Sequence, residues 1–159
     1  MKTNKLEITT PNDREVVVTR TFNAPRARVY DALMQPPLVR QWLLGPPGWE
    51  MPECHIDARP GGAYRYVWQN AADGRTFGMG GAFEELVPNE RIVATEKFDE
   101  PWYPGDAHVT QTLAESAGET TLTITVRYDS REARDGVLNA GMSNGMAASY
   151  DRLAALIES

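Results

Sequence analysis

The sequence predicts an α+β fold: a curved antiparallel sheet of about seven strands wrapped around one long C-terminal helix. One observation is a series of β-branched and aromatic stretches separated by turn residues. A second is an apolar stripe at helical spacing near the C-terminus. A third is a pair of short helical segments after the first strand. The long helix must bury its stripe, and the concave face of the sheet is the large apolar surface available to it.

The first strand is predicted over Glu15–Phe22, a run rich in valine and threonine. A short helix should follow from Pro25, because proline at the first helical position loses no hydrogen bond. Pro36 and its neighbour end that helix, and a second short helix is predicted over Pro37–Leu43. The composition of Gly45–Gly48 is that of a loop.

Six further strands are predicted, bounded by Gly, Pro, Asn and Asp turns. They are Met51–Ala58, Ala63–Gln69, Thr76–Leu86, Arg91–Phe98, Ala107–Glu115 and Thr120–Tyr128. The last one alternates cleanly, with large apolar side chains at even positions and threonines and an arginine at odd positions. This alternation indicates an antiparallel sheet with one face on the core and the other toward water.

The C-terminal helix is predicted from about Arg131 to Ile157. Asp129, with Glu132 three residues later, resembles a capping box. Apolar residues then recur at steps of three or four and form one stripe: Leu138, Met142, Met146, Tyr150, Leu153 and Ile157.

Length and charge limit the function. The 159 residues, 1–159, fit a single domain. Sixteen Lys and Arg against 22 Asp and Glu leave a net charge of −6, so a nucleic-acid partner is not expected. No apolar run approaches the ~20 residues that span a bilayer. Met1–Glu7 lacks the apolar segment of a signal peptide, and the single Cys54 excludes an intrachain disulfide. We therefore expect a cytoplasmic protein.

Neither a metal nor a cofactor is expected. The two histidines are His55 and His108, and Cys54 lies beside His55 in a strand, so the two side chains should face opposite ways. A zinc site usually needs three or four converging ligands. The segment Gly78–Phe83 resembles a dinucleotide fingerprint only superficially, because its last position is Phe and no helix follows.

Aromatic and methionine residues gather on the predicted inner faces of the sheet and the long helix, where Gly141 and Gly145 thin the helix. Two interpretations stay open on the residues alone: a tightly filled core, or a ligand cavity with a few polar groups. For the cavity, the candidate ligand-binding residues are Trp42, Trp49, Tyr64, Tyr66, Trp68, Met79, Phe83, Trp102, His108, Met142 and Met146.

Several segments together resemble a known family. They are Val18–Pro25 with Val29–Leu33, Trp42–Pro46, Asp57–Tyr64, Gly81–Pro88, Gly141–Gly145 and Tyr150–Leu153. They are similar to the SRPBCC superfamily (START-like, birch-pollen-allergen-like), and within it to bacterial homologues of the activator of the heat-shock protein 90 ATPase. The resemblance covers roughly residues 15–157. It implies a helix-grip fold with a cavity between the long helix and the sheet, which favours the cavity interpretation. Leu43-Leu44 departs from the second Trp or Phe of many relatives.

Three functions follow as alternatives. The first is binding of a small hydrophobic molecule, aromatic or lipid-like. The second is an enzyme of the cyclase, aromatase or hydrolase type in the same cavity, with Tyr64, Tyr66, His108 or Asp57 moving protons. The third is a chaperone ATPase co-regulator or another interaction module. A chaperone partner is not expected, because a domain of this length has no evident second docking domain. Homodimerisation stays open.

Overall fold

Eight antiparallel strands form one sheet, in the order β1-β2-β8-β7-β6-β5-β4-β3. The computed structural model describes residues 5–100 and 105–158, with Met142 described by its backbone alone. The strands are β1 (Glu7–Thr9), β2 (Glu15–Phe22), β3 (Trp49–Ile56), β4 (Ala63–Asn70), β5 (Thr76–Val87), β6 (Arg91–Phe98), β7 (Ala107–Ser116) and β8 (Glu119–Tyr128). The helices are α1 (Arg26–Met34), α2 (Pro36–Trp42), α3 (Arg131–Asn139) and α4 (Met142–Ile157).

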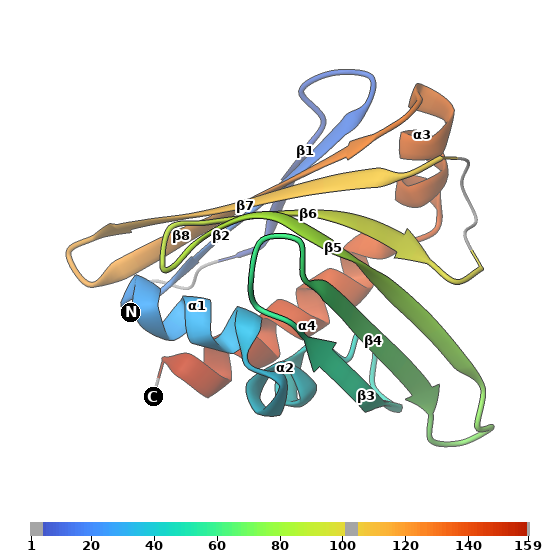
Figure 1. Cartoon of the computed structure of the whole chain (residues 1–159), viewed down its shortest axis with the longest axis horizontal. Coiled ribbons are helices and arrows are strands. Elements are labelled where there is room, and N and C mark those ends of the chain that lie inside the picture. The colour runs from blue at the N-terminus through green and yellow to red at the C-terminus, as the bar shows by residue number, and fades with distance from the viewer. Residues whose placement is uncertain (1–4, 101–104, 159) are drawn as a thin grey trace.

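The sheet is curved, and the helices α1, α2 and α4 lie on its concave side (Figure 1). Burial follows the alternation of the strands: along β2 and most of β8, every second side chain is buried. The helix α4 contacts both α1 and α2, so three helices share the concave face. This arrangement confirms the predicted α+β, helix-grip architecture.

The structure adds one strand to the seven that were predicted. The strand β1 is three residues long and pairs antiparallel with β2, with Ile8 opposite Val18. Three residues are too few to show a period of two, so the sequence pattern did not reveal this strand.

The long C-terminal helix is present as α4, but its predicted start at about Arg131 is wrong, because residues 131–139 form a separate helix, α3. Gly141 lies between α3 and α4 in the left-handed region, at φ 80° and ψ 28°, which ends the helical path there. The predicted capping box at Asp129 is also wrong. The Ser130 hydroxyl caps α3 by accepting from the Ala133 N–H at 3.1 Å. The Asp129 carboxylate instead accepts from the Asp106 N–H at 2.9 Å.

An ion pair between a buried arginine and an exposed aspartate joins the sheet to the helix that crosses it. Arg20 occupies an inward position of β2 and is 7% exposed. Its guanidinium donates to the carboxylate of Asp151 on α4 at 2.7 Å. Arg28 of α1 donates to the carbonyl of Ile157 at the end of α4. These contacts fix the axial position of α4, and therefore of every α4 residue that faces the sheet.

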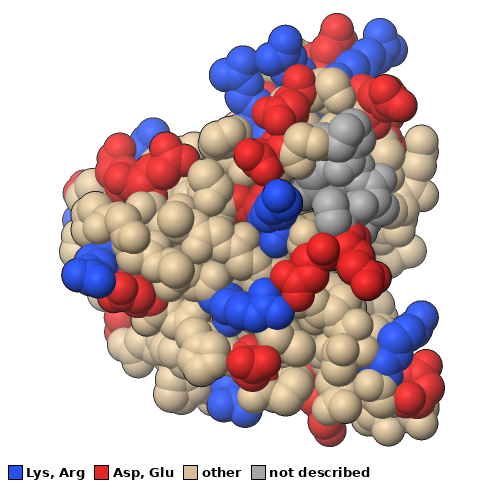
Figure 2. Space-filling view, turned by 45° about the vertical axis from the view of Figure 1, so that its right-hand side comes forward, with Lys and Arg blue, Asp and Glu red and all other residues tan. Residues whose placement is uncertain are grey.

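The described part of the chain has no helix long and apolar enough to span a bilayer. On the face drawn in Figure 2, acidic and basic side chains of the described residues are interspersed.

The same substitution at two glycines should change stability in opposite directions. Gly141→Ala should destabilise the protein by about 1–2 kcal/mol, because an alanine is strained in the left-handed region. Gly145→Ala should stabilise it by up to about 1 kcal/mol, because Gly145 is inside α4 and the added Cβ would meet Pro46 Cδ at an ordinary 3.6 Å. Urea denaturation measures both effects. A Gly141→Ala variant that is as stable as the wild type, or more stable, would contradict the break between α3 and α4.

Candidate ligand-binding cavity

A cavity of about 760 Å³ lies between the sheet and the helices. One wall consists of inward-facing side chains of β4 to β8, together with Trp49 of β3. The opposite wall comes from the ends of α1 and α2, the loop 43–46, the end of α3 and the first turns of α4. A volume in this range accommodates a drug-sized molecule.

A continuous row of aromatic rings forms the β4–β5 side of the cavity. Tyr64, Tyr66 and Trp68 alternate along β4 and are all buried. Neighbouring rings contact one another, with centroids 5.3 Å apart for Tyr64 and Tyr66 and 5.8 Å apart for Tyr66 and Trp68. Trp68 stacks on Phe77 of β5 at 4.9 Å. Phe77 is 42% exposed and also lines the cavity, so this row leads from the interior to the surface.

The structure brings eight of the eleven candidate ligand-binding residues together around this cavity. They are Trp42, Trp49, Tyr64, Tyr66, Trp68, Met79, Phe83 and Met146. Trp102 lies outside the described residues. Met142 begins α4, and its side chain is not described.

His108 does not line the cavity. It lies on β7 between Ala107, which is buried, and Val109, which faces the cavity, so the alternation turns it to the outer side of the sheet. There it is exposed, with Nδ1 3.6 Å from Oε1 of Glu84. Asp57 is exposed as well, pairing with Arg59 in the turn before β4. Neither residue is placed to transfer a proton within the cavity.

Several polar groups of the walls are already used to hold the walls together. The indole N–H of Trp42 donates to the Ala32 carbonyl at 2.8 Å, and that of Trp68 donates to the Leu43 carbonyl at 2.7 Å. The Tyr64 hydroxyl donates to the Thr95 carbonyl at 2.6 Å. The Ser149 hydroxyl of α4 accepts from the Gly45 N–H at 2.8 Å. These bonds attach the loop 43–46 to both β4 and α4.

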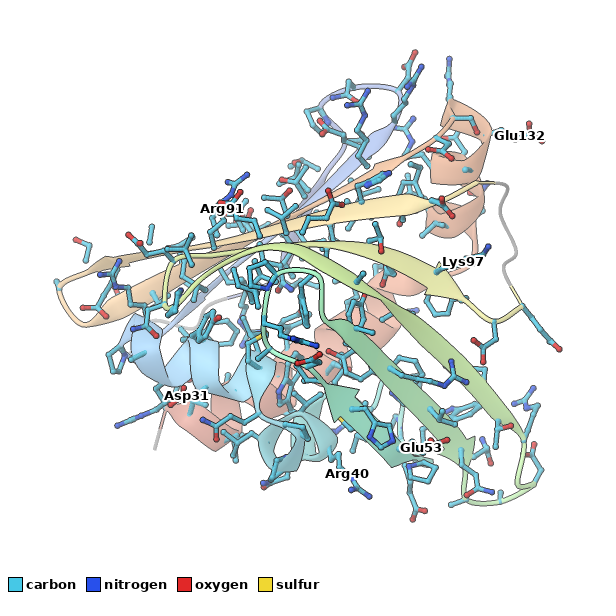
Figure 3. The ribbon with its side chains drawn as sticks, in the orientation of Figure 1. Asp31, Arg40, Glu53, Arg91, Lys97 and Glu132 are labelled. Carbon is cyan, nitrogen blue, oxygen red and sulfur yellow. The ribbon has the colours of Figure 1, made fainter. Side chains whose placement is uncertain are left out.

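Glu96 is the functional candidate that the sequence analysis missed. On β6 the even positions Ile92, Ala94, Glu96 and Phe98 all line the cavity. The odd position Arg91 points away from the helices, above the sheet (Figure 3). Within the described residues, the Glu96 carboxyl has no hydrogen bond or ion pair. Burial raises its pKa to about 7. The alternation of β6 would have revealed this position, because a glutamate there interrupts an apolar face.

Two phenol hydroxyls share the cavity with this carboxyl. Neither Tyr66 of β4 nor Tyr150 of α4 has a hydrogen-bonded hydroxyl among the described residues. Burial raises the pKa of both phenols above their ordinary value, and the negative charge of Glu96 adds to each shift. Gln111 and Asn144 add two amide side chains to the lining. The cavity is thus mainly apolar, with a few polar groups that a bound molecule can reach.

The described residues contain no group of three or more His, Cys, Asp or Glu side chains arranged to hold a metal ion. Cys54 is buried on β3, and burial raises its pKa to about 11. A thiol of this kind stays protonated at neutral pH and is a poor nucleophile.

Comparison with known proteins places the chain in a family. Residues 23–158 match the family model described as "Activator of Hsp90 ATPase homolog 1-like protein". The chain belongs to this family. The family lies within the SRPBCC superfamily, as the residue motifs of the chain predicted. No curated protein matches the chain.

Solved structures agree with this placement. A protein of Rhodobacter sphaeroides is 31% identical, with a TM-score of 0.89, over 96% of this chain and 97% of its own. A protein of Chromobacterium violaceum is 33% identical, with a TM-score of 0.81, over 93% of this chain and 99% of its own. A protein of Nitrosomonas europaea shares the fold at 23% identity, with a TM-score of 0.80, over 92% and 96% of the two chains.

The burial of Glu96 predicts a pH-dependent stability. The unfolded carboxyl ionises near pH 4.5, whereas the folded protein retains the proton until about pH 7. The folded state therefore loses stability as pH rises through this window, because it must ionise a buried group. The free energy of unfolding of Glu96→Gln, relative to that of the wild type, should therefore rise by on the order of 2–3 kcal/mol from pH 5 to pH 8, at about 1.4 kcal/mol per pKa unit.

Urea denaturation at the two pH values measures this gain. Glu84→Gln is the matched control, because Glu84 is exposed on β5 outside the cavity. The difference in free energy of unfolding between Glu84→Gln and the wild type should change by less than about 0.5 kcal/mol between the two pH values. A difference for Glu96→Gln that does not depend on pH would contradict the burial of this carboxyl.

Proposed function

We propose that the protein binds a small, mainly apolar molecule in the cavity between the sheet and α4. The observation that carries this proposal is the combination of about 760 Å³ of space with walls of aromatic and aliphatic side chains. Burying an apolar ligand there removes its surface from water, at about 25 cal/mol for each Å². The few polar groups that have no hydrogen-bond partner among the described residues, such as the hydroxyls of Tyr66 and Tyr150, would orient the ligand.

The residues proposed to contact the ligand are those that line the cavity. Trp42, Trp68, Tyr64 and Met79 form its inner part and are buried, whereas Trp49 and Phe77 stand at its exposed end. The rings of Trp49 and Phe77 pack edge to face at 5.2 Å. Large rings at that end supply apolar contact to an entering molecule without ordering flexible chains.

An enzyme acting in the same cavity is the second candidate, and the observation that favours it is Glu96. A carboxyl whose pKa is about 7 can both accept and donate a proton at neutral pH. The chaperone co-regulator rests on the family's description alone, and no feature of the described residues favours it.

Native mass spectrometry of the protein purified from its own host tests the binding function. A stoichiometric apolar adduct would support binding and give the mass of the ligand. Incubation of that compound with wild type and with Glu96→Gln then separates the two candidates. A carrier returns the compound unchanged, whereas an enzyme converts it and loses activity in the variant.

Filling the cavity should abolish binding. Val109→Trp adds a ring on the cavity face of β7, whereas Thr110→Trp adds the same ring to its outer face. We expect Val109→Trp to weaken binding of the neutral dye N-phenyl-1-naphthylamine at least tenfold, and Thr110→Trp to change it less than twofold. Dye fluorescence measures the affinity, and circular dichroism checks that both variants fold. Equal affinities of the two variants would place the dye elsewhere and count against the proposal.

A further inference from the structure

The cavity holds a carboxyl group, that of Glu96, that no described residue neutralises. No Lys, Arg or His is among the described residues that line the cavity, and the Glu96 carboxyl has no ion-pair partner in the described chain. Placing a carboxylate in an apolar site without a cation is costly. Outside the cavity the pattern differs: Glu85 pairs with Arg91, and Asp99 pairs with Arg65.

Two phenol rings lie close enough to Glu96 to respond to its charge. Tyr66 of β4 and Tyr150 of α4 both sense its charge, which raises the pKa of each. Phe98 is two residues farther along the same face of β6. The ring of Tyr150 is 5.1 Å from that of Trp42. Faces of aromatic rings attract cations, most strongly where water is excluded. A carboxylate and several aromatic rings that line one cavity together favour a positive charge.

We propose that the cavity selects molecules that combine an apolar body with a basic nitrogen, and that the protonated amine pairs with the Glu96 carboxylate. This inference rests on the proposed binding function and names the class of ligand. The amine would donate to the carboxylate, while the rest of the molecule contacts the apolar walls. Charge-assisted bonds of this kind are about twice as strong as neutral ones.

The same charge acts against anionic ligands. A fatty or aromatic acid would bring a second carboxylate into a site of low dielectric, where two like charges cannot both ionise cheaply. The cavity is therefore expected to discriminate among molecules of equal shape by the sign of their charge. Neutral molecules should bind with an affinity between those of the amine and the acid.

The pH dependence of amine binding comes from Glu96 alone. The other titratable groups lining the cavity in the described chain are the phenols of Tyr64 and Tyr66 on β4, Tyr128 on β8 and Tyr150 on α4. Phenols ordinarily titrate near pH 10, and an alkylamine stays protonated below about pH 10. Between pH 6 and pH 8, the group that changes charge is therefore the carboxyl of Glu96, whose pKa is about 7.

Three probes with one carbon skeleton test the proposal: 2-(1-naphthyl)ethylamine, 2-(1-naphthyl)ethanol and 1-naphthylacetate. Isothermal titration calorimetry at pH 8 should give an amine affinity at least tenfold above that of the alcohol, and an acetate affinity at least tenfold below it. From pH 8 to pH 6, amine affinity should fall about tenfold as the carboxyl takes up its proton, while alcohol affinity stays constant.

Two variants assign the effect to one residue. In Glu96→Gln the amine and the alcohol should bind within threefold of each other, and the acetate should gain affinity. In Glu84→Gln, which removes an exposed glutamate of β5, the wild-type order should persist. Wild-type protein gives a readout that needs no variant. At pH 6.5, amine binding should release protons, seen as a heat that depends on the buffer, whereas alcohol binding should not.

The outcomes distinguish a failure of this inference from a failure of the proposed binding function. If the alcohol binds and the amine is no tighter, the cavity binds apolar molecules and the inference is overturned. An amine preference that survives in Glu96→Gln also overturns it, because the charge would then reside elsewhere. If none of the three probes binds up to its solubility limit, the proposed binding of small apolar molecules fails, and the charge preference fails with it.

Discussion

The structure depends on how the helices cover the concave face of the curved sheet: they shield it from water but do not fill the space above it. The inward side chains of the sheet are apolar and must be shielded from water. Three helices share the concave face (Figure 1), but α4 presents small residues such as Gly145 and Ser149 to the cavity. A close-packed interior would fill this space with larger side chains. The covered but unfilled volume is the cavity, and the proposed function follows from it.

The walls of the cavity are fixed by specific polar contacts. Arg20 ties β2 to α4 through Asp151, and the Ser149 hydroxyl ties α4 to the loop that follows α2. The indoles of Trp42 and Trp68 use their N–H groups on backbone carbonyls. Because these groups are satisfied within the protein, they shape the cavity without competing for a ligand. Among the described residues, the Glu96 carboxyl and the hydroxyls of Tyr66 and Tyr150 make no such bond and can contact an occupant.

Membership of the family fixes the architecture, and the side chains of this chain determine what its cavity accepts. The same fold can carry unrelated functions, because function depends on the residues of the site. Here those residues form an aromatic row along β4 and β5 and place one carboxyl beside it on the neighbouring strand β6. The apolar rings set the shape and hydrophobicity of a ligand. The carboxyl adds a preference for charge that the fold alone does not imply.

The sequence by itself indicated the succession of the long strands and short helices along the chain, the core faces of β4 and β8, and eight residues that line the cavity, because alternation with a period of two is a local property. It also indicated the apolar stripe of the last helix, but not the turn at Gly141, since the stripe continues across it. Only the tertiary structure decided that the core has a void and that Glu96 faces it. A volume depends on how distant walls approach one another, and the desolvation of a carboxyl adds up over residues of several elements.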